Sequence, residues 1–305
     1  MQQQAKNFIV KNRKLSLLVL IIVCTISTQT FCQNNQTPTD NNILLKGKIL
    51  DLENNLPLSY TSIGILDKPL GTLSDSAGNY SFTVGKENLS DTVQISVVGY
   101  YPKKITAGEL LQANEKVIRL TVKITLLDDV VITAGKRNTV IVGRQSASKL
   151  FQVSVHNKKT ADETIGSEMG MKMKTRKTGA TIQNFNWYLS ANNFKLIKFR
   201  VNVYALKNDL PDTLISNQPI FVTIADFKTG WTKIDLTPYN IKVNGDFIIT
   251  LQWVEGKMEK KENPVTIVPV AITPFSKNCY VRIASQDKWK RLGATLSCFV
   301  TLVYA

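Results

Sequence analysis

Short runs of alternating apolar and polar residues, each closed by turn-forming residues, recur along most of this chain. A period of two places successive side chains on opposite faces of a strand, whereas the spacing typical of an amphipathic helix is scarce here. A length of 305 residues gives room for two domains with separate cores. The sequence therefore predicts an all-β protein with two domains.

The best-defined runs lie between residues 45 and 135. Strands are predicted over 46–50 and 62–66, each followed by turn residues. Asp75 and Gly78 then provide turn chemistry before an alternating run with Tyr80 at its start, so a hairpin with an apolar face is expected. Further strands are predicted over residues 92–100, which end in a Gly-Tyr bend, and over residues 117–120.

The order of these segments resembles the carboxypeptidase-D regulatory-like domain. The resemblance is carried by Gly47, Pro57, Gly71, Asp75, Gly78, Tyr80, Gly99 and Tyr100, followed by the run LLDDVVITAGK. This family is a transthyretin-like sandwich of seven strands, common in exported proteins of Bacteroidetes and often found before TonB-dependent outer-membrane receptors. The resemblance implies that fold for residues 44–123, an exported setting, and no catalytic activity in this part of the chain.

The amino-terminal residues 1–32 have the pattern of an export signal. Four cationic residues precede an apolar run over 15–26, which is shorter than the ~20 residues that a membrane-spanning helix needs. Cleavage after Cys32 would leave Gln33 first, at the start of a polar linker over 33–43. We therefore expect a protein of the periplasm or outer-membrane surface of a Gram-negative bacterium, at most peripheral to the membrane.

Lipid attachment at Cys24 or Cys32 is the alternative to simple cleavage. Lipidation requires a small residue just before the cysteine, and Val23 and Phe31 stand there instead. The sequence therefore favours an unlipidated chain.

The chain is basic, with a formal net charge of +15, four units of which belong to the signal and leave +11. An excess of this size can attract nucleic acid, but these basic residues are spread along predicted strands and export argues against a nucleic-acid partner. The densest group, MKMKTRK over 171–177, is predicted as a loop or edge strand whose lysines oppose aggregation. Residues 124–145 are predicted as a connecting strand and linker.

Residues 146–305 are predicted to form a second, jelly-roll-like β-sandwich, because turn clusters separate many short strand patterns. The run GWTKIDLTPYNIKVNGDFIITLQW loosely resembles jelly-roll modules of exported bacterial proteins. The predicted strands cover residues 150–155, 169–174, 181–189, 198–204, 220–224, 232–236, 246–253, 265–272, 279–284 and 297–304.

Strand parity separates the tryptophans into two groups. Trp187 and Trp253 fall with apolar neighbours and are predicted in the core, whereas Trp231 and Trp289 fall with charged neighbours and are predicted exposed. With Tyr188 they are candidate ligand-binding residues, because exposed rings stack on sugars or anchor protein partners. The alternative is that they cap the ends of the sandwich.

Two further sets of residues have a structural and a functional interpretation. Cys279 and Cys298 share the apolar parity of their strands, so they either form a disulfide or remain buried thiols. Lys198, Arg200 and Tyr204 share the polar face of one strand. This face is a second candidate binding surface, but we expect it to be a solvated outer surface.

The sequence gives no combination of residues suited to catalysis. His156 is the single histidine, no G-x-S-x-G motif occurs, and a carboxypeptidase zinc site needs more ligands than one histidine provides. Asp128 and Asp129 are adjacent and point to opposite faces of a strand, and the pattern does not place Glu163 and Glu168. We therefore expect no enzyme activity, no cofactor and no metal.

Two functions remain from different classes. The first is a non-catalytic exported accessory protein that binds an envelope protein or envelope component through its sandwich surfaces. The second is a carbohydrate-binding module that uses Trp231, Trp289 or Tyr188. The sequence indicates neither the identity of the ligand nor the oligomeric state.

Overall fold

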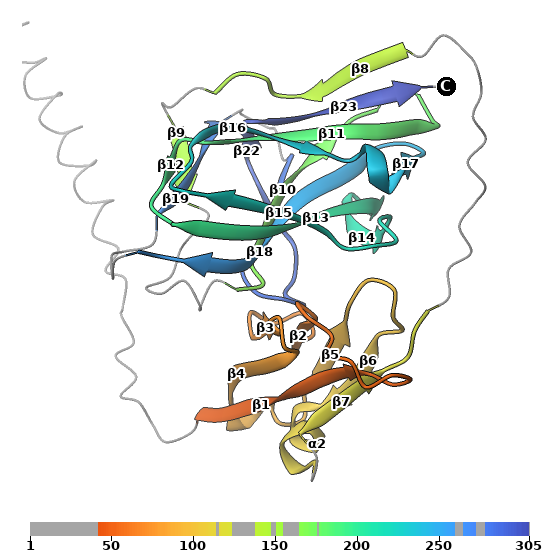
Figure 1. The fold of residues 1–305 in the computed structure, drawn as a ribbon, viewed down its shortest axis with the longest axis vertical. Helices are drawn as coiled ribbons and strands as arrows, with labels where there is room; N and C mark the ends of the chain where they lie inside the picture. The colour runs from red at the N-terminus through yellow and green to blue at the C-terminus, as the bar shows by residue number, and fades with distance from the viewer. Residues whose placement is uncertain are drawn as a thin grey trace, which may run out of the picture. The chain divides into compact units, whose positions relative to one another are not determined.

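Two β-sandwiches, one within residues 42–123 and one within residues 138–304, make up the computed structural model (Figure 1). The structure describes residues 42–113, 116–123, 138–147, 151–154, 165–175, 177–259, 265–272 and 278–304. Within these ranges, no helix has the length and apolar composition needed to cross a bilayer. The predicted export signal, most of the polar linker, residues 124–137 of the predicted connecting segment, and the residues Asp128, Asp129, His156 and Glu163 lie outside them. The prediction of an all-β protein is confirmed.

A three-stranded and a four-stranded sheet form the first sandwich. The strand orders are β4-β1-β7 and β3-β2-β5-β6, with β1 antiparallel to β4 and parallel to β7. The elements are β1 (Asn42–Asp51), β2 (Ser62–Ile65), β3 (Gly71–Leu73), β4 (Asn79–Gly85), η1 (Lys86–Asn88), β5 (Thr92–Ser96), β6 (Lys103–Thr106), α2 (Ala107–Gln112) and β7 (Val117–Leu120). Alternate residues of β4, beginning with Tyr80, are buried in the core, as the sequence pattern predicts.

The predicted hairpin around Asp75 is wrong in its pairing, although its turn forms as expected. The Asp75 carboxylate accepts the backbone N–H groups of Ala77 and Asn79, both at 2.8 Å, and Gly78 has a φ of +80°. However, β3 pairs with β2 while β4 pairs with β1. The turn therefore carries the chain from one sheet to the other, because the same turn residues serve a sandwich corner as well as a hairpin.

The second sandwich contains three sheets. The main strand orders are β14-β13-β18-β10-β20-β21, β16-β11-β23-β8 and β12-β19-β22, while β15, β17 and β9 pair with β13, β11 and β19. The first half runs through β8 (Asn138–Gly143), β9 (Phe151–Ser154), β10 (Glu168–Met173), β11 (Ala180–Leu189), β12 (Ala191–Asn192), β13 (Leu196–Lys207), β14 (Leu210–Leu214) and β15 (Ile220–Ala225). The second half runs through β16 (Gly230–Asp235), η3 (Thr237–Tyr239), β17 (Lys242–Val243), β18 (Phe247–Lys257), β19 (Thr266–Ile272), β20 (Cys279–Arg282), β21 (Lys290–Leu292), β22 (Ala294–Leu296) and β23 (Cys298–Tyr304).

Aromatic and aliphatic side chains from the sheets meet in the core of the second sandwich. Trp187 and Trp253 are 2% and 0% exposed, which confirms the prediction that both lie in the core. The Trp253 ring packs edge-on against Phe194 and Phe199, with centroids 5.0 and 5.3 Å away. Residues of the described β8, expected in the connecting segment, pair with β23 and so extend a sheet of this sandwich.

The core also contains the two cysteines of the predicted second sandwich. Cys279 and Cys298 are buried free thiols, the second of the two alternatives stated above. Burial raises the pKa of the Cys279 thiol to about 12, so it is neutral at physiological pH. These thiols therefore behave as small apolar core residues.

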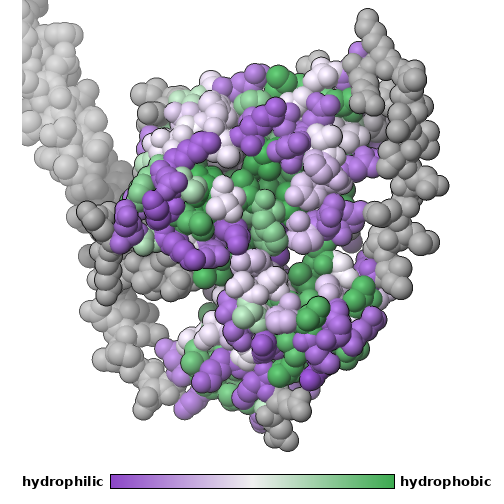
Figure 2. Space-filling model, in the orientation of Figure 1, coloured by the Kyte–Doolittle hydropathy of each residue, from purple (hydrophilic) through white to green (hydrophobic). Residues whose placement is uncertain are grey.

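The prediction that the basic group at residues 171–177 is a loop or edge strand holds for residues 174, 175 and 177, which lie outside the strands, and is wrong for residues 171–173. Residues 168–173 form β10, which lies between β18 and β20 within its sheet. The Lys172 ammonium pairs with Asp209 at 2.9 Å and with Asp246 at 3.2 Å, so local acids compensate its charge. Hydrophilic residues are spread widely over the face shown in Figure 2.

Candidate functional site

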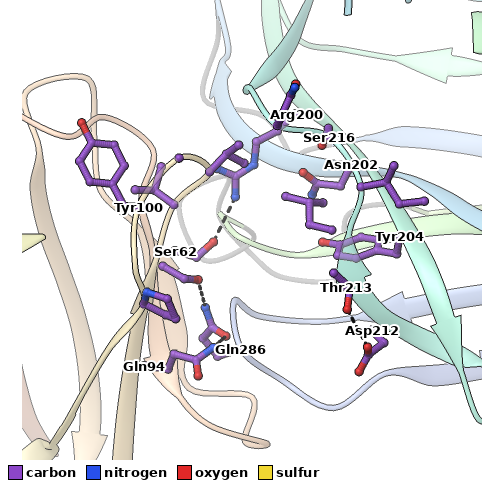
Figure 3. Close-up of a pocket in the computed structure, with 18 of the residues that line it drawn as sticks. Ser62, Gln94, Tyr100, Arg200, Asn202, Tyr204, Asp212, Thr213, Ser216 and Gln286 are labelled. Atoms are coloured by element: carbon purple, nitrogen blue, oxygen red, sulfur yellow. Dashed lines mark hydrogen bonds between the residues drawn. The ribbon is translucent and has the colours of Figure 1, made fainter. Parts of the chain in front are cut away.

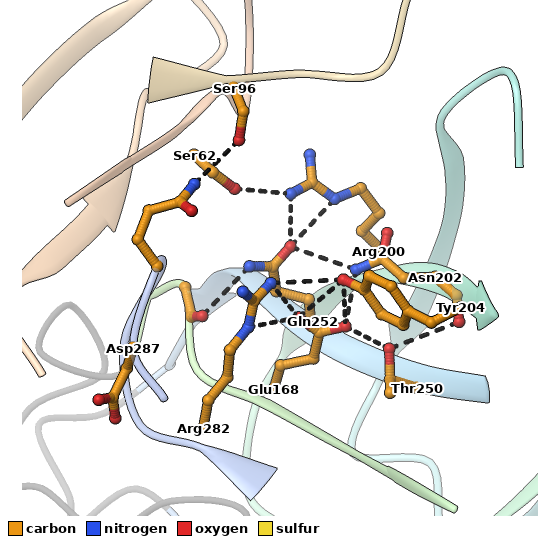
Figure 4. A network of polar contacts seen from close by, with 12 residues as sticks. Ser62, Ser96, Glu168, Arg200, Asn202, Tyr204, Thr250, Gln252, Arg282 and Asp287 are labelled. Atoms are coloured by element: carbon orange, nitrogen blue, oxygen red, sulfur yellow. Dashed lines mark hydrogen bonds and ion pairs between the residues drawn. The ribbon is translucent and has the colours of Figure 1, made fainter. Parts of the chain in front are cut away.

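Four polar side chains form a row across neighbouring strands of the second sandwich. Arg200 on β13 lies opposite Gln252 on β18, Gln252 lies opposite Glu168 on β10, and Glu168 lies opposite Arg282 on β20. We call these four residues the polar row (Figure 4). Residues of opposite parity on the same strands fill the core, so the alternation that builds the hydrophobic face also aligns the polar row.

Glu168 is the buried anion of the polar row. Its carboxylate accepts hydrogen bonds from Asn202 at 2.8 Å, from Tyr204 at 3.1 Å, from Arg282 Nε at 2.8 Å, and from Thr250. Burial acts to raise the pKa of Glu168, but the charge of Arg282 and the hydrogen bonds outweigh it and lower the pKa below its ordinary value. Glu168 is therefore ionised and bonded to its neighbours.

Arg200 connects the polar row to the first sandwich. Its Nη1 donates to the backbone oxygen of Tyr60 at 2.9 Å, and its Nη2 donates to Ser62 Oγ at 3.1 Å. The Nε group donates to Gln252 Oε1 at 3.1 Å, which fixes the other edge of the guanidinium. Arg200 is only 5% exposed, so its charge is held in a buried position by neutral acceptors from both sandwiches.

Gln286 makes a second connection between the sandwiches. Its side-chain oxygen accepts from Gln94 and its side-chain nitrogen donates to Ser96, both at 2.9 Å. Its backbone oxygen accepts the N–H of Asp67 at 2.9 Å. The loop that carries Gln286 is therefore bonded to the four-stranded sheet of the first sandwich through side chain and backbone.

Glycine allows the backbones to approach closely beside this loop. A Cβ atom added at Gly64 or at Gly71 would lie 2.5 Å from the backbone oxygen of Ser285, too close for any side chain. Gly71 is one of the residues that carry the family resemblance. In this chain it is thus also required for contact with the second sandwich.

Aromatic contacts complete the interface near Tyr60. The Tyr60 ring packs edge-on against Phe221, with centroids 5.2 Å apart. Its hydroxyl accepts a hydrogen bond from Lys198 Nζ at 2.9 Å. Lys198 therefore reaches the first sandwich, beside Arg200 on the same face of β13.

A cleft of about 520 Å³ opens beside the polar row (Figure 3). One wall comes from the first sandwich and the other from the second, and Arg200 and Arg282 contribute to its lining. Below, "the cleft" always means this cavity. Its lining also includes Ser62, Gln94, Ser96, Gly99, Tyr100, Lys123, Asn202, Tyr204, Asp212, Thr213, Ser216, Asn217, Gln286 and Trp289.

The structure separates the three predicted ligand-binding aromatics. Trp289 is half-buried, lines the cleft, and packs against the Arg282 guanidinium at 4.8 Å and edge-on against Tyr204. Trp231 and Tyr188 lie on the sheet β16-β11-β23-β8, where Trp231 also contacts Phe299 edge-on at 5.1 Å. We call Tyr188, Trp231 and Phe299 the aromatic patch; all three are half-buried.

The expectation that Lys198, Arg200 and Tyr204 lie on a solvated face is wrong for the last two. Arg200 and Tyr204 are 5% and 9% exposed because the polar row and the first sandwich surround them. Alternation shows which face a residue is on, and it does not show what covers that face. The available signal was that uncharged Thr250 and Gln252, rather than lysine or glutamate, stand on the polar parity of β18.

The cleft presents hydrogen-bond donors and acceptors whose positions are fixed by one another. Asn202 and Tyr204 both donate to Glu168, and Trp289 restrains Arg282. Among the residues that the structure describes, no cluster of three or more side chains is suited to hold a metal ion. Hydrogen-bonding side chains that are fixed in this way are suited to reversible binding of a polar ligand.

Glu168→Gln is expected to lower the free energy of unfolding by about 3–5 kcal/mol at pH 7, because it leaves Arg282 buried without its anion. Because the pKa of Glu168 is lowered in the folded protein, the ionised carboxylate stabilises the fold at pH values above its ordinary pKa of 4.5. This stabilisation is lost as the pH falls below 4.5 and through the lowered pKa. The wild type and the variant should therefore converge in acid. Urea denaturation followed by tryptophan fluorescence measures this, since all four tryptophans lie in the second sandwich.

Asp226→Asn is the matched control, because it removes the carboxylate of an exposed pair with Lys195. No measurable change in stability is expected for it. A Glu168→Gln variant as stable as this control at pH 7 would contradict the role given to the buried pair.

Comparison with known proteins gives a match for the first sandwich. Residues 45–132 match the family model of the CarboxypepD_reg-like domain, and no curated protein matches the chain significantly. Among solved structures, the cysteine protease and lectin-like domains of Cwp84, a surface layer associated protein of Clostridium difficile, are 8% identical with a TM-score of 0.38. That alignment covers 81% of this chain and 58% of the other.

Two further structures are also distant. Clostridial Cwp84 after propeptide cleavage is 9% identical with a TM-score of 0.38, covering 89% of this chain and 73% of that one. The infectious bursal disease virus Gx strain structure is 8% identical with a TM-score of 0.26, covering 87% and 63%. These scores support no conclusion on function. Residues 45–132 of this chain are therefore similar to the CarboxypepD_reg-like domain.

Proposed function

We propose that this chain is a non-catalytic binding protein that takes an envelope protein or envelope component into the cleft. The observation that carries the proposal is that both sandwiches contribute fixed polar side chains to one cavity. A site assembled in this way exists only while the two sandwiches are in contact. Its position is typical of ligand sites at domain interfaces.

The polar row supports a binding role over a catalytic one. A general base needs a lone pair that is free to accept a proton from a substrate. The Glu168 carboxylate instead accepts hydrogen bonds from four surrounding side chains, and its pKa is lowered. It therefore serves to hold the side chains of the cleft in position.

The proposal includes an exported location and specific folds. The pattern of residues 1–32 supports export to the periplasm or the outer-membrane surface. N-terminal sequencing of the processed chain tests this by showing whether Gln33 comes first.

The strand orders support specific folds for the two sandwiches. The pairing of a three-stranded with a four-stranded sheet supports a transthyretin-like first sandwich. The stacked sheets of the second support a jelly-roll-like arrangement, which an experimental structure with a different strand order would contradict.

Thr213→Trp is expected to abolish partner binding, because Thr213 is exposed at the cleft and a tryptophan there would fill part of the cavity. Thr83→Trp, at an exposed position on β4 away from the cleft lining, is the matched control. Envelope proteins and glycans retained by the immobilised wild type are purified and titrated against both variants by calorimetry. Equal affinity of both variants for every retained molecule would exclude the cleft as the binding site.

A carbohydrate-binding role for the aromatic patch is the second candidate. Tyr188 and Trp231 face each other across β11 and β16, with ring centroids 5.3 Å apart, and Phe299 adjoins Trp231 from β23. Partly exposed rings on one sheet face suit stacking on sugar rings. This observation favours the aromatic patch over Trp289, which lines the cleft, as a sugar platform outside the cleft.

A glycan array distinguishes the two candidates. If the aromatic patch binds sugar, Trp231→Ala should remove the signal, whereas Thr213→Trp should leave it unchanged, because only the first variant alters the stacking surface. Glycan binding that survives Trp231→Ala would rule out the aromatic patch.

A further inference from the structure

We propose that the cleft recognises the carboxylate of an acidic saccharide, which pairs with Arg282 at the end of the polar row. This inference rests on the proposed function of the cleft as a binding site and adds the chemical class of its ligand. Three features of the cleft carry it: the orientation of Arg282, the charges around it, and the neutral side chains that line the rest of the cavity.

The Arg282 guanidinium is held on one edge and one face. Its Nε and Nη2 groups donate to Glu168, and its Nη2 group also lies 3.4 Å from the Tyr204 hydroxyl. The Trp289 ring covers one face, with its centroid 4.8 Å from the guanidinium carbon. Within the described residues, the hydrogen bonds of the Arg282 guanidinium are made by Nε and Nη2 and not by Nη1, and Arg282 lines the cleft. A fixed arginine with a free donor is suited to pair with a carboxylate.

Positive charge exceeds negative charge in the lining of the cleft. Arg200, Arg282 and Lys123 contribute three cations, and Asp212 contributes one anion. Glu168 compensates Arg282, but the hydrogen bonds of Arg200 go to the neutral oxygens of Gln252, Tyr60 and Ser62.

Asp287 also acts on Arg282 through its charge, although it does not belong to the lining of the cleft. Its carboxylate accepts the backbone N–H of Lys288 at 2.8 Å. The cavity itself is therefore cationic and attracts an anionic ligand.

Neutral hydrogen-bonding side chains line much of the remaining cavity. They include Asn202, Thr213, Ser216 and Gln94, which are labelled in Figure 3, and also Asn217 and Ser96. Amides and hydroxyls of this kind pair with the hydroxyl groups of a sugar, and about 520 Å³ falls within the size range of small-molecule pockets. A saccharide that carries a carboxylate matches both the neutral and the cationic parts of the cleft.

The test compares acidic saccharides with their neutral counterparts on the unaltered protein. Trisaccharides of galacturonic, glucuronic and mannuronic acid, each with its carboxyl-reduced form, are titrated into the full chain by calorimetry. At least one acid is expected to bind about tenfold or more tightly than its reduced form, because the reduced form cannot make the charge-assisted pair. Since the protein is the same in both arms, misfolding cannot produce the difference.

Two variants then assign the difference to the cleft. Arg282→Lys keeps the charge beside Glu168 but loses the planar guanidinium, and Lys123→Gln removes an exposed cation of the lining. Both should weaken binding of the acid while thermal melting shows a folded chain. Thr83→Trp, at the exposed β4 position away from the cleft lining, should leave it unchanged.

Other outcomes overturn the inference. Equal binding of acid and reduced forms, no binding of any acid, or loss of binding in Trp231→Ala alone would each contradict it. Binding of pentaglutamate with no binding of the saccharides would replace the saccharide with an acidic peptide. If a neutral partner is retained by the chain and lost in Thr213→Trp, the proposed function stands while this inference fails.

Discussion

The buried guanidinium of Arg200 is the constraint on which the rest of the structure depends. Removing a charge from water is costly unless hydrogen bonds replace its hydration. Arg200 meets this condition with Gln252 in its own sheet and with Tyr60 and Ser62 in the first sandwich. Because these acceptors come from both sandwiches, the charge is satisfied only when the two are in contact.

The rest of the site follows from that contact. Gln286 and the close backbone approach at Gly64 and Gly71 align the first sandwich beside the polar row. The cleft forms where this contact ends, so its walls inherit side chains that are already fixed by hydrogen bonds. Fixed donors reduce the entropy that is lost on binding, which explains why an interface built for stability also suits ligand recognition.

The sequence predicted on which face of a strand a side chain lies, but it did not predict what covers that face. Alternation correctly placed Trp187 and Trp253 in the core, because a period of two separates the faces of a strand with no knowledge of its partners. It failed for Arg200, because burial of a polar face depends on a domain more than 130 residues away in sequence. The polar row also depends on the register of four strands, which no local pattern specifies. The predicted hairpin around Asp75 was wrong for a related reason: the turn residues do not determine which strands pair.

Calorimetric unfolding of the full chain tests the central claim most directly. If Arg200 couples the sandwiches, the wild type should unfold in one cooperative transition, and Arg200→Gln should separate it into two, since each sandwich has its own hydrophobic core. Two well-separated transitions in the wild type, or a single unchanged transition in Arg200→Gln, would contradict the account.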